Sequence, residues 1–498
     1  MSYKNSAIDE KKQSVSENSR SDRPETDTVK VPVSGVEEHL RLLNTQLREA
    51  LKEVGELIEK DILIQTPGQL EEFEKETADK TDRLAGLILG LGLQKSLNSP
   101  EMREDSAALI KSFPKKMKNQ GIRKVVINPL RGIPVTVKTE YFSPKAKKDR
   151  RKRKRRGCYP GLVLSGIYDR CTPGLSSDIA LTATALSSFE EARYILNERG
   201  RDLDIKTIRN VTIRYSERSR SAGLIQSDEF AENVAGCSVV ISTDGGRIRI
   251  RERKSGRKTE KGRNRYKAAW REPKILIIYT AGEDGRMEKS FAPIIDGTLK
   301  GPDAVFSLIG YYLEKIGITK ADRVLFIADG ARWIWNRVEK LMMSAGVGKW
   351  YELIDFYHAV GHLNKIAGLQ KWKKNLRKRW VTKYRRLLLK GKSVEVIGEI
   401  RRVCRGGKSR KLRTEKDYFI RNRSRLFYDK VAVAGLPAGS GSVESAVRRV
   451  VNLRLKGAST YWLRETAEAM LMLRSYFKAG RWNMLKKLSF SVNISNAA

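Results

Sequence analysis

The sequence predicts a mixed α/β protein with a mainly helical region in front of it. Between residues 237 and 363, apolar runs of strand length alternate with segments of helical periodicity. Earlier, residues 36–63 place leucines at helical spacing, and from residue 122 the apolar period shifts towards two. Because 498 residues exceed one ordinary core, we expect two or three domains.

The region before residue 160 is predicted to hold a polar tail, three helices and a β-hairpin. The helices are expected at 36–63, around 69–93 and around 101–112, and the hairpin turns near 129–132. The tail is expected to be disordered because it has few apolar residues. The expected domain boundaries are as follows: tail 1–33, helical region 34–120, hairpin and basic arm 121–160, helix-turn-helix region 161–232, first part of the α/β core 233–360, basic helical insertion 361–434, and the rest of the core 435–485.

The charge of the chain predicts a polyanionic partner. There are 99 Lys and Arg residues against 58 Asp and Glu, a net charge of +41, and such a balance favours nucleic acid because neutralised phosphates release counterions. Membrane binding is disfavoured, because the apolar run at 84–93 is far shorter than the ~20 residues of a spanning helix. The polar first residues do not resemble a signal peptide, so we expect a cytoplasmic, nucleoid-associated protein.

Cysteine usage predicts neither disulfides nor zinc. The chain has four cysteines, Cys158, Cys171, Cys237 and Cys404, and no CxxC pair. Paired cysteines at short spacing are what a zinc site or a disulfide framework requires. The pattern fits a reduced compartment.

Two segments are candidates for DNA contact. Residues 145–156 hold ten basic residues out of twelve, including Lys152 and Arg153; they form either a phosphate-contacting arm or a solvated linker. Residues 176–215 contain two helical patterns separated by a turn at 198–204, the outline of a helix-turn-helix or of a plain helical hairpin. In the first case the second helix presents Lys206, Arg209 and Arg214 to DNA.

Two predicted strands end in Asp-Gly, at Asp244 and Asp329. Taken singly, Asp-Gly after a strand is usually a turn. Here both belong to a series β-β-β-α-β-α-β, the order of an RNase H-like fold, in which the first and fourth strands are neighbours. The first strand is expected to form a hairpin with the Arg-Ile-Arg-Ile run through Gly245 and Gly246, and 288–295 is expected to be the third strand. Two close carboxylates favour a divalent cation, and Mg²⁺ prefers such oxygen ligands.

Glu444 is the candidate third acid. It begins a predicted helix that ends near Gly457, with Val443, Ala446, Val447 and Val450 as its apolar stripe. Arg448, one turn after the glutamate, is expected to contact a DNA phosphate or to restrain the carboxylate. A phosphodiester site with two metal ions needs a further acid. The alternative is a first-turn glutamate that interacts with the helix dipole and Arg448.

Asp355, His358 and the residues after them are expected near the same site. His358 and His362 have the spacing of half a zinc site, but HAVGH lacks the glutamate of a zinc protease, and contact of His358 with DNA is the preferred reading. Residues 361–430 then carry 24 Lys and Arg against five Asp and Glu, with aromatic residues interleaved. We expect a DNA-facing helical insertion whose aromatic side chains form its own core.

Four motifs together resemble a known family. STDGGRIRIRE, IADGARWIWN, IDFYHAVGHL and LPAGSGSVESAVRRVVNLRLKG, in this order within roughly 237–483, look like the catalytic signatures of DDE insertion-sequence transposases of the ISKra type. The resemblance implies an RNase H-like domain with Asp244, Asp329 and Glu444 as the DDE triad, two Mg²⁺ ions for which Mn²⁺ can substitute, and chemistry on the element's own DNA ends. Members often carry cysteine pairs after the β-rich segment; here that place holds the basic run.

The expected function is therefore that of a transposase that binds terminal inverted repeats and performs Mg²⁺-dependent DNA cleavage and strand transfer as a homodimer or larger assembly. Two alternatives remain open. A structure-specific nuclease or resolvase on the same fold uses the same carboxylates without joining DNA. A non-catalytic DNA-binding regulator needs none of the three acids.

Overall fold

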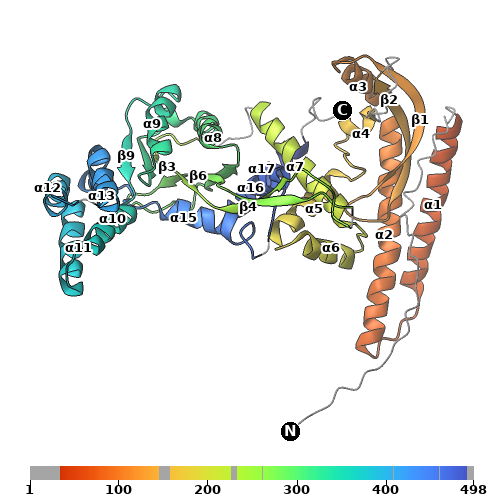
Figure 1. Ribbon diagram of the computed structural model, residues 1–498. Coiled ribbons are helices and arrows are strands. Elements are labelled where there is room, and N and C mark those ends of the chain that lie inside the picture. Colours follow the sequence, from red (N-terminus) through yellow and green to blue (C-terminus); the bar gives the residue numbers. More distant parts are fainter. Residues whose placement is uncertain are drawn as a thin grey trace, which may run out of the picture. The chain divides into compact units, whose positions relative to one another are not determined.

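The computed structural model describes residues 34–144, 157–225, 233–260, 262–407, 409–458 and 460–490 (Figure 1). The chain divides into two compact units, Met1–Leu162 and Val163–Ala498, and a short helix α4 (Pro160–Leu164) spans the point of division. The predicted tail at 1–33 and the basic run with Lys152 and Arg153 lie outside the described residues.

Within residues 34–144, the first unit holds three helices and a hairpin, as predicted. Its elements are α1 (Ser34–Glu59), α2 (Pro67–Asn98), α3 (Pro100–Lys111), β1 (Met117–Ile127) and β2 (Val135–Pro144). Leu43 and Ala50 of α1 pack against Leu87 and Leu91 of α2. The strands β1 and β2 pair antiparallel, so the period-two pattern identified the hairpin correctly.

A five-stranded sheet in the order β7-β6-β3-β8-β9 forms the centre of the second unit. Neighbours β3–β6 and β6–β7 are antiparallel, whereas β3–β8 and β8–β9 are parallel. The strands are β3 (Ser238–Gly245), β6 (Lys274–Ala281), β7 (Ile294–Thr298), β8 (Arg323–Ala328) and β9 (Tyr351–Ile354). The prediction that the strands leading to Asp244 and Asp329 are neighbours is confirmed.

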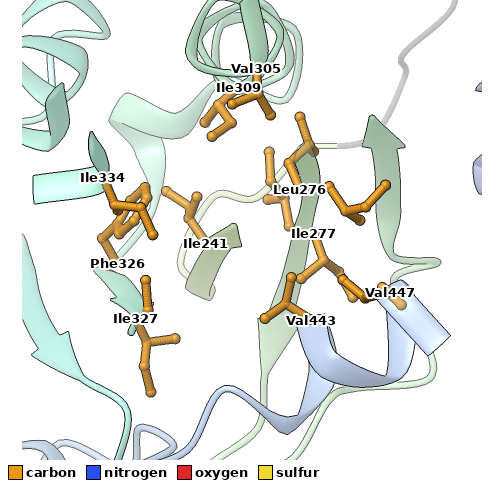
Figure 2. Close-up of a cluster of buried hydrophobic side chains, with 14 of the residues drawn as sticks. Ile241, Leu276, Ile277, Val305, Ile309, Phe326, Ile327, Ile334, Val443 and Val447 are labelled. Atoms are coloured by element: carbon orange, nitrogen blue, oxygen red, sulfur yellow. The ribbon is translucent and has the colours of Figure 1, made fainter. Parts of the chain in front are cut away.

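Helices cover both faces of this sheet (Figure 2). On one side lie α8 (Pro302–Lys315), which contacts β6 and β7, and α9 (Arg332–Ser344), which packs on α8. On the other side α15 (Gly441–Val447) packs on β3 and β6 through Val443 and Val447. Successive residues of a strand point to opposite faces, and in Figure 2 Leu276 lies towards α8 and Ile277 towards α15.

Two strand predictions were wrong. The run after Gly246, β4 (Ile248–Arg253), does not pair with β3; it pairs with β5 (Tyr266–Arg271), a strand that was not predicted. The reason is that β3 lies between β6 and β8, so neither of its edges is open to a hairpin partner. The third strand begins at Ile294 and not at 288, because the preceding Pro293 has no N–H to donate to a ladder.

The helices before the sheet are α5 (Pro173–Ala185), α6 (Phe189–Glu198) and α7 (Ile205–Ile225). The predicted turn between α6 and α7 is present, and Gly200 adopts a φ of 73° in it, which favours glycine. However, α7 is 21 residues long and not short. Its residues Ile208, Val211 and Tyr215 are buried, and α7 packs on α5, α16 and α17.

The basic insertion is helical, and its aromatic residues form a core, as predicted. Its elements are α10 (Phe356–Leu369), α11 (Lys374–Leu389), α12 (Ser393–Val403), α13 (Arg410–Arg421) and α14 (Tyr428–Val433). Trp380, Tyr384, Tyr418, Phe419 and Tyr428 are buried, while Trp372 and Phe427 are partly buried against them.

The chain ends with α15, a π-helical turn at Arg448–Asn452, α16 (Arg464–Lys478) and α17 (Trp482–Phe490). The expected helix to Gly457 is therefore too long. In the π-helical turn the Leu453 N–H donates to the Arg448 carbonyl at 3.0 Å, so the i+4 spacing from Glu444 to Arg448 does not continue beyond Arg448. No helix in the described part of the chain has the length and apolar character needed to cross a bilayer.

Candidate active site

Asp244 lies at the carboxyl end of β3 and is half-buried. Its Oδ1 accepts the N–H of Gly245 at 2.6 Å. The following Gly246 donates to the Pro273 carbonyl at 2.9 Å and lies against Val451, where a Cβ would come within 3.0 Å of the valine side chain. Glycine is needed here so that the end of β3 can approach the π-helical turn after α15 closely.

Asp329 directly follows β8, the parallel neighbour of β3. Its Oδ1 accepts the Ala331 N–H at 3.0 Å, and its carbonyl accepts the indole N–H of Trp335 at 2.6 Å. These bonds fix the aspartate at the start of α9. Gly330 beside it is covered by the ring of Tyr418, which a Cβ at position 330 would strike. The insertion therefore packs directly on the Asp329 loop.

Glu444 is in the first turn of α15, and its carboxylate is exposed. Its Oε1 lies 3.3 Å from Nε2 of His358 on α10. The buried stripe Val443, Ala446, Val447 and Val450 was predicted correctly. It holds α15 on β3 and β6, so Glu444 is carried by a helix that packs on the strand of Asp244.

Asp355 connects three of these elements. The side chain is 1% exposed. Its Oδ1 accepts the His358 N–H at 2.6 Å as the N-cap of α10, and its Oδ2 accepts both the N–H and, at 2.8 Å, the hydroxyl of Ser440. Its own N–H donates to the Ala328 carbonyl at 2.8 Å. The backbone of Asp355 thus bonds to the end of β8, and its carboxylate fixes the starts of α10 and α15, which carry His358 and Glu444.

Arg474 on α16 hydrogen-bonds to the backbone of the π-helical turn. It is 3% exposed, and its guanidinium donates to the carbonyls of Val450 at 3.2 Å, Arg449 at 2.8 Å and Thr184 at 2.7 Å. Burial lowers the pKa of Arg474 to about 10. Two of its acceptors belong to the turn, so the arginine fixes the backbone that follows Glu444.

The three carboxylates influence one another electrostatically. Burial raises the pKa of Asp244, and the charges of Asp329 and Glu444 raise it further, whereas the Gly245 N–H and His358 act in the opposite direction. A carboxyl with a raised pKa beside two others is typical of a functional site, although structural charge networks also produce it. That the three acids form one site stays a prediction.

The donors present are hard oxygens of the type that Mg²⁺ prefers. Among the described residues, the second oxygens of Asp244 and Asp329 accept no hydrogen bond, so each aspartate keeps an oxygen for a ligand. With the side chains as they stand, no three His, Cys, Asp or Glu residues of the described ranges gather closely enough to hold a metal ion. The oxygen ligands suit a divalent cation. The Glu444 carboxylate, however, contacts His358 in this arrangement.

His362 belongs to a different contact. Its Nδ1 faces Oε2 of Glu415, and its ring stacks on Tyr418 with centroids 3.6 Å apart. Burial lowers the pKa of His362, and Glu415 acts in the opposite direction. His358 and His362 therefore have separate carboxylate partners, which does not favour half a zinc site.

The predicted DNA-contacting residues are spread over two helices. Lys206 is exposed and Arg209 is half-buried on α7, while Arg214 is paired with Asp169. Arg448 is exposed directly after α15, one turn beyond Glu444. Lys152 and Arg153 belong to the run outside the described residues.

Sequence reasoning missed Ser440, Tyr418 and Arg474 as residues that shape the site. Ser440 lies four residues before Glu444 and could have been proposed as a helix cap. Tyr418 and Arg474 carry no local signal, because their contacts depend on segments far away in the chain. Comparisons with protein-family models, with curated proteins and with solved structures give no match for this chain.

Proposed function

We propose that this protein is a DDE-type transposase of an insertion sequence, which cleaves the ends of its element and joins them to target DNA. The observation that carries the proposal is that Asp244 and Asp329 lie at the carboxyl ends of the adjacent parallel strands β3 and β8, with Glu444 on the helix α15 that packs on β3. The charges of Asp329 and Glu444 also raise the pKa of Asp244. The sheet order, antiparallel on one side of β3 and parallel on the other, supports an RNase H-like assignment.

Each acid has a distinct part in the proposed chemistry. Asp244 and Asp329 each offer one carboxylate oxygen to divalent cations, and Glu444, oriented by His358 through one oxygen, offers its other oxygen. Mg²⁺, when bound, would activate the attacking water or 3′-hydroxyl and stabilise the leaving 3′ oxygen. No covalent protein–DNA intermediate is part of the proposal.

The surrounding residues support DNA as the substrate. Arg448 is exposed one turn from Glu444, where it can contact a phosphate beside the scissile bond. The turn between α6 and α7, with Lys206 and Arg209, is proposed to bind the terminal repeats as a helix-turn-helix. Pairing of two element ends implies a dimer or larger assembly on DNA.

A strand-transfer assay tests the proposal. Purified protein, Mg²⁺ and DNA flanking its gene should yield element ends covalently joined to a target plasmid. Cleaved ends without joined products would favour a structure-specific nuclease. Binding with neither product would favour a regulator.

A further inference from the structure

The ribbon of β4 and β5, with the loop that joins its strands, is strongly basic. Residues 247–271 contain 12 Lys and Arg against two Glu. Two residues, Gly246 and Arg247, separate the end of β3 from the start of the ribbon. No role in the proposed chemistry accounts for it so far.

The two faces of this ribbon differ. Ile248 and Ile250 point inwards and are buried. On the same face, Glu252 is paired with Lys267 and Arg271. The other face, here named the arginine face, consists of Arg249, Arg251, Arg253, Tyr266 and Trp270 of the ribbon together with Tyr461. It contains no acidic side chain.

Arginines and aromatic rings alternate on the arginine face. The Arg249 guanidinium lies 5.6 Å from the Trp270 ring and 4.7 Å from the Tyr461 ring. Arg251 lies 4.7 Å from the Tyr266 ring. Tyr461 is held beside the ribbon because the neighbouring Trp462 exchanges backbone hydrogen bonds with Arg249 and Arg251. Such stacking restricts the guanidinium planes before any ligand arrives.

The rings are well exposed, Trp270 at 52% and Tyr266 at 46%. Aromatic rings that served only to stabilise the fold would be buried. Arg249 donates one N–H to the Gly457 carbonyl at 2.8 Å. Guanidinium groups stacked on rings keep their remaining N–H groups for phosphate oxygens, and the absence of acids on this face favours a polyanion.

We infer that the arginine face binds the sugar-phosphate backbone of duplex DNA. The ribbon follows directly from the strand of Asp244, so a duplex on this face would extend from the candidate active site. This inference extends the proposed function by assigning the surface that carries the DNA. Contacts of this type position DNA and do not read its sequence.

Two double variants of the same ribbon test the inference. Arg251→Gln with Arg253→Gln removes two charges from the arginine face, and Lys267→Gln with Arg271→Gln removes two charges from the opposite face. Duplex affinity is measured by fluorescence anisotropy over a range of salt concentrations, with the full chain in EDTA. Arg253→Gln alone serves as a variant that removes no described contact, so its fold should be intact.

Each phosphate contact contributes about 0.9 to the steepness of log K against log salt concentration. The arginine-face variant should therefore make this plot less steep by about 1.8, and Arg253→Gln alone by about 0.9. The control pair should leave the slope nearly unchanged, and the loss should be equal for two unrelated duplex sequences. Superimposable curves for the two double variants would overturn the inference. So would a changed oligomeric state of the arginine-face variant, which would indicate a second copy of the chain as the occupant.

The proposed function can fail separately. The two double variants can differ in the salt dependence of binding while the wild-type protein shows no Mg²⁺-dependent cleavage. In that case the ribbon binds DNA, but the three carboxylates do not form a cleavage site. If cleavage is intact and the slopes agree, the ribbon assignment alone is wrong.

Discussion

The Nε2 atom of His358 lies 3.3 Å from Oε1 of Glu444. Both residues are in the first turns of helices whose starts are fixed by the buried carboxylate of Asp355. The contact occupies one oxygen of Glu444 and leaves the other to face a ligand. His358 is thus a positioning residue for the third acid of the proposed site.

Replacement of His358 by Ala should raise the Mg²⁺ concentration for half-maximal DNA cleavage by about tenfold, because partners that orient a metal ligand affect affinity on this scale. The pair is exposed, so the melting temperature should change little. A Mg²⁺ titration of cleavage measures the effect, with the exposed Asn364→Ala on the same helix as control. An unchanged Mg²⁺ requirement would exclude the positioning role.

Replacement of Asp355 by Ala should destabilise the second unit by about 3 kcal/mol, because buried N–H groups of Ser440 and His358 lose their acceptor. Ser440→Ala removes only the hydroxyl bond and should lower the free energy of unfolding by about 1 kcal/mol. Urea unfolding of both variants gives the comparison. Equal losses would show that the carboxylate does not organise both helix starts.

In the metal-free protein, the ionised form of Asp244 should make the folded state less stable at neutral pH than a neutral side chain at this position would. A raised pKa means that the folded state holds the proton more tightly than the unfolded state, so stability falls as the pH rises above the ordinary value of 3.8 towards the folded pKa, and stays lower above it. Asp244→Asn keeps the acceptor for Gly245 and removes the charge.

In EDTA at pH 7, Asp244→Asn should therefore raise the melting temperature by about 2 °C. Mg²⁺ should raise the melting temperature of the wild type and leave that of the variant nearly unchanged. Differential scanning calorimetry measures both, with the exposed Asp322→Asn as control. A Mg²⁺ shift of equal size in Asp244→Asn would argue against cation binding by Asp244.

Gly330 and Tyr418 should be strongly coupled. Gly330→Ala forces a methyl group into the Tyr418 ring and should destabilise the fold by about 1–3 kcal/mol, and Tyr418→Ala should cost about 3–5 kcal/mol. In the double variant the methyl group enters the space left by the ring, so the combined loss should be smaller than the sum by about 1 kcal/mol or more. Additive losses would mean that the insertion does not pack on the Asp329 loop in solution.

Periodicity predicted most of the fold. The helices of the first unit, the hairpin and the existence of β3 and β8 follow from local patterns, because strands with apolar runs and amphipathic helices leave strong signals. That β3 and β8 are neighbours was predicted from the strand order of an RNase H-like fold. The partner of β4 could not be predicted. An Arg-Ile-Arg-Ile run after Gly-Gly reads as a hairpin, and only the complete sheet shows that both edges of β3 are occupied.

The acidic residues of the candidate site could be named from the sequence, whereas the residues that position them could not. Asp244, Asp329 and Glu444 stand at ends of elements, where turn residues and helix starts mark them. The π-helical turn after α15 depends on Arg474, whose guanidinium reaches the turn from another helix. No spacing within residues 441–457 encodes that contact, so the helix was expected to continue.

The most direct test of the proposed triad is Mg²⁺-dependent cleavage of DNA flanking the gene by purified Asp329→Asn, compared with Asp322→Asn at the start of the same strand. Asp322 is exposed and paired with Arg323, so its replacement matches the charge change away from the site. We predict that wild type and Asp322→Asn cut the DNA, and that Asp329→Asn binds it equally well but fails to cut. Full cleavage by Asp329→Asn would contradict the assignment.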